Sequence, residues 1–96
     1  MTWIKTVPLE QADDLLRSCY EAMYRLYPPE YRQEVEAVRR PDGGSDSISS
    51  AHSLIPEGML HAMSTLGVLL RPELPLTRQQ HEMIASVVSA QNRCFY

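Results

Sequence analysis

A thiol and a carboxylate near the end of the sequence are the side chains best suited to chemistry. Cys94 stands in the closing stretch Asn92–Tyr96, and Glu82 lies twelve residues before it. A cysteine thiolate is a nucleophile, and a carboxylate can exchange a proton with a nearby thiol or peroxide. Twelve residues of straight helix span about 18 Å. The two groups can therefore meet only through a bend after Val88, a helix that folds back, or a second subunit.

Both side chains also have an ordinary structural interpretation. Free cysteines mostly behave as small apolar residues, so Cys94 could be an unreactive thiol at a frayed end. Glu82 stands one position off an apolar stripe, where a solvated carboxylate near a helix amino terminus is favoured by the helix dipole. Partial burial would instead raise its pKa and suit proton exchange. The burial of Glu82 separates these two interpretations.

The other residue types with reactive side chains point to packing. Cys19 lies on an apolar stripe and is expected in the core as an inert thiol. The methionines at helical apolar positions are expected to fill the core as well, namely Met23, Met59, Met63 and Met83. The three histidines lack the short spacing of a helical zinc motif, and no glycine-rich phosphate loop is present. Neither a metal nor a cofactor is expected.

Composition and charge exclude several classes of protein. The net charge is -3 and no basic run is longer than Arg39-Arg40, so no nucleic-acid partner is expected. No apolar run approaches the roughly 20 residues that span a bilayer, which argues against a membrane partner. The start of the chain lacks the layout of a secretory signal. These features predict a cytoplasmic protein, where a Cys19–Cys94 disulfide is disfavoured.

Apolar residues recur at helical spacing along most of the chain, which predicts an all-α fold, a helical bundle. The predicted helices are Leu9–Leu26, a surface helix Pro29–Arg40, Leu54–Leu70, and a last helix from Arg78 to about Arg93. Pro41–Ser50 is rich in Gly and Ser and predicts a loop. Thr77 and Gln80 fit a capping box at the start of the last helix. We expect two segments, residues 1–50 and residues 51–96.

The segment Leu76–Tyr96 resembles the active-site region of the alkylhydroperoxidase D-like, or carboxymuconolactone decarboxylase-like, superfamily, and its peroxidase-related branch in particular. It reads LTRQQHEMIASVVSAQNRCFY, in which Glu82 precedes Cys94 by the twelve positions that the family pattern has. Ala51–His61 is similar to the family's preceding helix, and Trp3–Pro8 is similar to the amino terminus of the branch. The resemblance covers most of the chain, with specific motifs only from Leu76 onward.

The resemblance implies a thiol-dependent peroxidase that reduces alkyl hydroperoxides through a Cys-x-x-Cys pair, with a thiol reductant. It assigns Cys94 to the resolving cysteine and Glu82 to the proton relay. The second cysteine and the histidine of the family motif are not found after Tyr96. The chain is therefore expected to be the amino-terminal half of such a fold and to lack turnover by itself.

Two other functions stay open at this point. One is a non-catalytic helical module whose last helix docks on another chain or on its own copy. The other is a decarboxylase on the same fold. An amphipathic last helix without a closing partner exposes apolar surface, so a homo-oligomer is expected in either case.

Overall fold

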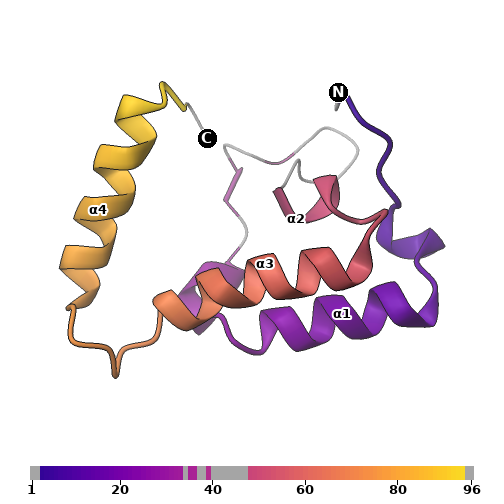
Figure 1. Cartoon of the computed structure of the whole chain (residues 1–96), viewed down its shortest axis with the longest axis horizontal. Helices are drawn as coiled ribbons and strands as arrows, with labels where there is room; N and C mark the ends of the chain where they lie inside the picture. The colour runs from indigo at the N-terminus through magenta and orange to yellow at the C-terminus, as the bar shows by residue number, and fades with distance from the viewer. Residues whose placement is uncertain (1–2, 34, 37–38, 40–47, 95–96) are drawn as a thin grey trace.

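The structure, a computed structural model, describes residues 3–33, 35–36, 39 and 48–94. Among these residues there are four α-helices, short stretches of 3-10 helix and no strand, which confirms the all-α prediction (Figure 1). Two helices form the core, and the last helix stands apart from them. The elements in chain order are η1 (Leu9–Gln11), α1 (Asp14–Tyr24), η2 (Pro29–Arg32), α2 (Ile48–Ala51), α3 (Pro56–Leu69) and α4 (Arg78–Gln91).

Helix α1 carries the buried stripe that its sequence predicts. Asp13 caps the helix, because its carboxylate accepts a hydrogen bond of 2.8 Å from the backbone N–H of Leu16. Leu16, Cys19 and Met23 follow at spacings of three and four and are all buried. The prediction that Cys19 is a core thiol is confirmed.

Helix α3 lies beside α1 and runs in the same direction (Figure 1). It begins at Pro56, whose ring suits the first helical position and whose missing N–H is not needed there. Met59 is fully buried against the α1 stripe, and Met63 packs at its edge. Because α1 comes from residues 1–50 and α3 from residues 51–96, the two expected segments share this core.

The buried side chain of Ser53 attaches the stretch of chain before η1 to the core. The hydroxyl of Ser53 accepts a hydrogen bond of 2.8 Å from the backbone N–H of Val7, and Ser53 is only 2% exposed. Val7 packs on the core in turn. This bond joins residues 46 positions apart and closes the end of the α1–α3 pair.

The segment after α1 differs from its prediction. Pro29–Arg32 forms the 3-10 helix η2 and Gln33 is already extended, so the continuous surface helix expected over Pro29–Arg40 does not pass Arg32. The 3-10 turn is held by Arg32, whose guanidinium donates a 2.7 Å hydrogen bond to the carbonyl of Tyr24. The rest of the expected helix, and most of the expected loop Pro41–Ser50, lie largely outside the described residues; Ser49 and Ser50 belong to α2.

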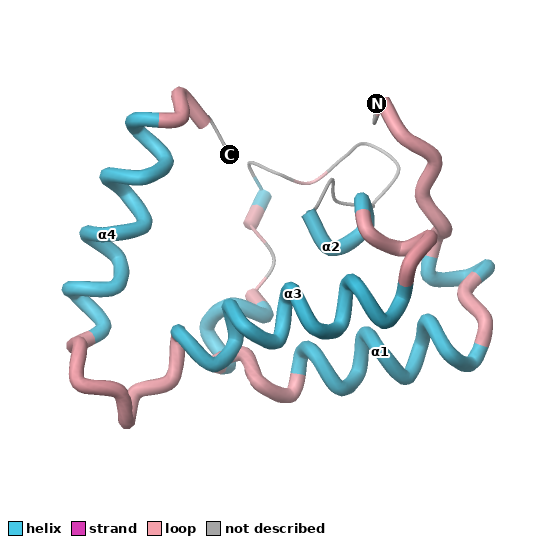
Figure 2. Tube along the Cα trace, viewed as in Figure 1, coloured by secondary structure: helices cyan, strands magenta, loops and turns pink. Residues whose placement is uncertain are grey.

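Helix α4 is formed by local signals and projects away from the α1–α3 pair (Figure 2). The capping box is confirmed: Thr77 Oγ accepts from the N–H of Gln80, and the Gln80 side chain accepts from the N–H of Thr77. None of its residues is buried. The prediction that Met83 fills the core is therefore wrong, since this side chain is 53% exposed. Apolar residues at helical spacing predict that a helix has an apolar face, but they do not predict which other surface packs against that face.

Candidate functional site

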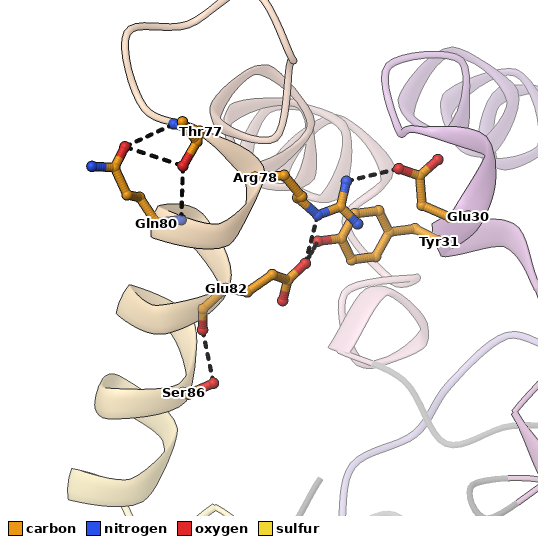
Figure 3. Close-up of polar contacts among 7 residues, drawn as sticks. All are labelled: Glu30, Tyr31, Thr77, Arg78, Gln80, Glu82 and Ser86. Carbon is orange, nitrogen blue, oxygen red and sulfur yellow. Dashed lines mark hydrogen bonds and ion pairs between the residues drawn. The ribbon is translucent and has the colours of Figure 1, made fainter.

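Glu82 is held by two donors on the side of α4 that faces η2 (Figure 3). The hydroxyl of Tyr31 donates a hydrogen bond of 2.6 Å to Glu82 Oε1, and Arg78 Nε donates another of 2.6 Å to the same oxygen. Arg78 precedes Glu82 by four residues, so the two lie on one face of the helix. One turn of α4 and the distant residue Tyr31 thus fix the carboxylate together.

Arg78 links this carboxylate to a second one. Its Nη1 donates a hydrogen bond of 2.8 Å to Glu30 Oε1, and its guanidinium lies 4.4 Å from the ring centroid of Tyr31. Glu30 and Tyr31 both belong to η2. We call Glu30, Tyr31, Arg78 and Glu82 the Glu82 cluster. It connects the first turn of α4 to η2 and lies at the protein surface.

The Glu82 cluster shifts the ionisation of two of its members in opposite directions. The pKa of Glu82 is lowered, first by the hydrogen bond from Tyr31 and then by the one from Arg78. The pKa of Tyr31 is raised to about 12, first by burial and then by its bond to the negatively charged Glu82, against the opposing charge of Arg78. At neutral pH Glu82 is ionised and Tyr31 keeps its proton.

The burial of Glu82 decides between the two sequence-based interpretations of this residue. Its side chain is 51% exposed and its pKa is lowered, which agrees with a solvated edge carboxylate. The alternative interpretation required Glu82 to be partly buried with a raised pKa, and the structure shows neither property. In this arrangement Glu82 is ionised at neutral pH, and it is a weaker base than an ordinary carboxylate because its two donors stabilise the charged form.

Cys94 follows the carboxyl end of α4 as a free, exposed thiol. The N–H of Cys94 donates to the carbonyl of Ser89 at 2.9 Å, and the N–H of Arg93 donates to Ala90 at 3.1 Å, which is the bonding of a Schellman cap. Arg93 has φ of 51°, in the left-handed region where glycine is usual. This cap fixes the backbone at Cys94, so the thiol is presented on an ordered turn.

The structure does not bring Glu82 and Cys94 together. Helix α4 is continuous to Gln91, so there is no bend after Val88, and Glu82 is separated from Gln91 by about 14 Å of helical rise. One of the three routes to contact is thereby removed within this chain. A segment that folds back over α4 and a second subunit remain.

An open groove of about 430 Å³ adjoins the Glu82 cluster. It lies between the end of α1 and the connection from α3 to α4, and Glu30 and Arg78 contribute to its wall while Glu82 and Cys94 do not. Its floor is mostly apolar, and its size is within the range of small-molecule sites. The residues that line it are Leu26, Tyr27, Pro28, Pro29, Glu30, Leu70, Arg71, Pro72, Glu73, Arg78 and His81.

Sequence reasoning found Glu82 but missed its partners. The Arg78–Glu82 pair has the i, i+4 spacing of a helical ion pair, and that local signal was available. Tyr31 is 51 residues away from Glu82 and Glu30 is 48 residues away from Arg78, so no local pattern points to them. The described residues contain no group of three His, Cys, Asp or Glu side chains placed to hold a metal ion.

Comparison with known proteins adds no relative to this picture. No family model, no curated protein and no solved structure matches the chain. Within the described residues, no helix has the length and apolar character needed to cross a bilayer.

Proposed function

We propose that this chain supplies a resolving thiol and a base to a thiol-dependent peroxidase similar to the alkylhydroperoxidase D-like superfamily. The observation that carries the proposal is the placement of Cys94. It is a free, exposed thiol on a capped turn, at the end of the helix whose first turn fixes the ionised Glu82. The twelve-residue spacing of these two residues is the one that the resemblance gives to the peroxidase-related branch.

The reaction takes two steps, and two thiols are needed. A thiolate attacks the terminal oxygen of the hydroperoxide, so an S–O bond forms, the O–O bond breaks and the departing alkoxide takes up a proton to become an alcohol. The resulting sulfenic acid is then attacked by the second thiol, which forms a disulfide and releases water. The thiol reductant regenerates both sulfurs.

Cys94 suits the second step. Its thiol is exposed, so the sulfenic acid of another cysteine can reach it, and its attack requires loss of the thiol proton. Glu82 is ionised, and it can take that proton only in an assembly that brings it near Cys94, because α4 holds the two apart within one chain. Cys19 cannot be the first thiol, because it is 4% exposed within the α1–α3 core. The attacking thiol therefore comes from another segment or another chain.

The test supplies the missing thiol. The chain is lengthened after Tyr96 so that a cysteine comes directly next and a histidine follows four residues later. This longer chain is mixed with cumene hydroperoxide and a dithiol, and the loss of hydroperoxide is measured over time. We expect consumption at least about tenfold above the dithiol alone, loss of that gain with Cys94→Ser, and no loss with Cys19→Ala. The 96-residue chain should show no gain. Equal consumption by the lengthened chain with and without Cys94→Ser would refute the proposal.

A second function is favoured by a different observation, the uncovered apolar face of α4. Four of its side chains are more than half exposed, namely Met83, Ile84, Val87 and Val88. An apolar stripe of this kind commonly marks a surface that binds another polypeptide. The chain would then be a helical interaction module. Its mass in sedimentation should exceed that of a monomer and should not change with Cys94→Ser.

A further inference from the structure

Two helices of this chain each carry an apolar stripe that nothing in the described residues covers. On α4 the stripe consists of Met83, Ile84, Val87 and Val88, at the i, i+1, i+4, i+5 positions of one helix face. We call it the α4 stripe. It points away from Glu82, because Arg78 and Glu82 occupy the opposite side of the helix and face η2.

The second stripe lies on the flank of α3 that α1 leaves open. Ala62, Leu66 and Leu69 are exposed and share one side of the helix by their spacing of four and three, and Ile55 precedes them at the start of α3. Leu66 is 46% exposed and Leu69 is 56% exposed. Ile55, Ala62, Leu66 and Leu69 are the α3 stripe.

The two stripes do not meet within one chain. Among the described helices only α1 and α3 pack extensively against each other, and α4 stands to one side of them (Figure 1). The Glu82 cluster ties the first turn of α4 to η2. Pro72 and Pro75 restrict the connection from α3. Helix α4 is thereby held as a projecting arm with its stripe outward.

We propose that the partner of each stripe is a second copy of this chain, with α4 of one copy lying on the α3 stripe of the other. Both halves of the contact are present on one chain, so a reciprocal pair closes on itself without leaving either stripe open. No charged residue lies between Glu82 and Arg93, and the α3 stripe contains none. Like charges therefore do not oppose the contact.

The area of the two stripes favours this exchange over pairing of α4 with α4. A side chain of this size has roughly 60 to 120 Å² of apolar surface, so at about half exposure the α4 stripe offers roughly 180 Å². Two α4 stripes would bury too little for a specific interface. Reciprocal contact of both stripes buries roughly 600 Å² of apolar surface and roughly 1,000 Å² in all, which reaches the lower limit for a specific pair.

This inference deepens the second function above and does not depend on the thiol. The Cys94→Ser variant should therefore keep the mass of the dimer, and a failure of the peroxidase test leaves the exchange unaffected. The converse also holds, because a monomeric chain would refute the exchange without bearing on hydroperoxide reduction.

The test uses two complementary variants, Val87→Lys on the α4 stripe and Leu66→Asp on the α3 stripe. Sedimentation velocity at about 200 µM should give a dimer for the unaltered chain and a monomer for each variant alone. A mixture of the two should give a heterodimer again. In that heterodimer one contact is unaltered and the other pairs the introduced lysine with the introduced aspartate.

The matched control is Leu15→Asp. Leu15 is 53% exposed on α1, as exposed as Val88, and belongs to neither stripe, so this variant should remain a dimer. Circular dichroism of each variant checks that its helices are retained. Three results would each overturn the exchange: a monomeric unaltered chain, a dimeric Leu66→Asp variant, or a mixture of the two variants that stays monomeric. If only Val87→Lys abolishes the dimer, the pairing is between two α4 helices instead.

Discussion

Gly67 allows α3 to approach the chain that leaves α1. A Cβ atom placed on Gly67 would lie 2.8 Å from Leu26 Cβ and 3.0 and 3.1 Å from two carbons of the Tyr27 ring. Leu26 Cβ is fixed by its backbone, which cannot turn away as the end of a flexible side chain can. Gly67→Ala therefore requires α3 to shift relative to the end of α1.

Two opposing effects set the size of the change. Alanine is favoured over glycine within a helix by about 1 kcal/mol. Inserting a methyl group into a closely packed contact costs typically about 1–3 kcal/mol, and the 2.8 Å approach indicates the upper part of this range. We expect Gly67→Ala to lower the free energy of unfolding by about 1–2 kcal/mol. For a chain of this length that corresponds to a fall in Tm of roughly 4–16 °C.

Gly58→Ala is the matched control on the same helix. A Cβ at Gly58 would lie 3.2 Å from Ile55 Cγ2, a methyl group on a side chain that is 68% exposed and needs to give way by only a few tenths of an ångström. The helix preference then dominates, and this variant should gain up to about 1 kcal/mol. Thermal and urea unfolding followed by circular dichroism compares the two variants. If Gly67→Ala is as stable as Gly58→Ala, the close approach of α3 and α1 is not as described.

Four further predictions concern polar groups and the cap at the end of α4. Ser53→Ala removes the buried acceptor of the partly buried Val7 N–H and should lower the free energy of unfolding by about 1–3 kcal/mol in urea titrations. An unchanged midpoint would contradict the bond. Carbon-detected NMR should give a pKa for the Glu82 carboxyl below its ordinary range, and this pKa should rise in Tyr31→Phe. Because the pKa is lower in the folded than in the unfolded state, Glu82 contributes stability above the unfolded pKa, and this contribution is lost as pH falls through the folded pKa. Ultraviolet absorbance should show the phenol of Tyr31 ionising near pH 12. Because this pKa is raised in the folded state, the contribution of Tyr31 to stability is present below pH 10 and is lost as pH rises through about 12. Ionisation near pH 10 would refute the contact with Glu82. Arg93→Gly should raise the Tm, since it relieves a left-handed backbone at an unchanged Schellman cap, and a lower Tm would contradict that cap.

Local signals in the sequence predicted the elements that depend on local chemistry. The capping box of Thr77 and Gln80 and the stripe of Leu16, Cys19 and Met23 are both present in the structure, because each is specified by residues within one or two turns. The continuous helix expected over Pro29–Arg40 is interrupted at Gln33, directly after η2. Its thin apolar face offered little to bury, and the contacts of Tyr31 lie with Glu82, 51 residues away.

The candidate site was less predictable for the same reason. The resemblance singled out Glu82 and Cys94 as candidate residues, but no sequence pattern supplied the distant donor that holds Glu82, or the lowered pKa that follows from its hydrogen bonds. The exposure of Met83 likewise depends on whether another surface reaches α4. Periodicity assigns a face to a helix, whereas its partner is decided by tertiary or quaternary contact.

The two proposals use opposite sides of α4 and can both hold. Glu82 and Arg78 face η2, so a partner that covers Val87 on the far side leaves the Glu82 cluster intact. Within that cluster each exposed ion pair contributes little by itself, because solvent screens the charges. Three contacts nevertheless cross from α4 to η2 and together orient the helix, namely Tyr31–Glu82, Arg78–Glu30 and the Arg78 guanidinium on the Tyr31 ring. Removing the acceptor with Glu82→Ala should therefore loosen the direction of α4 and weaken an α3–α4 exchange, whereas Cys94→Ser should leave that exchange unchanged.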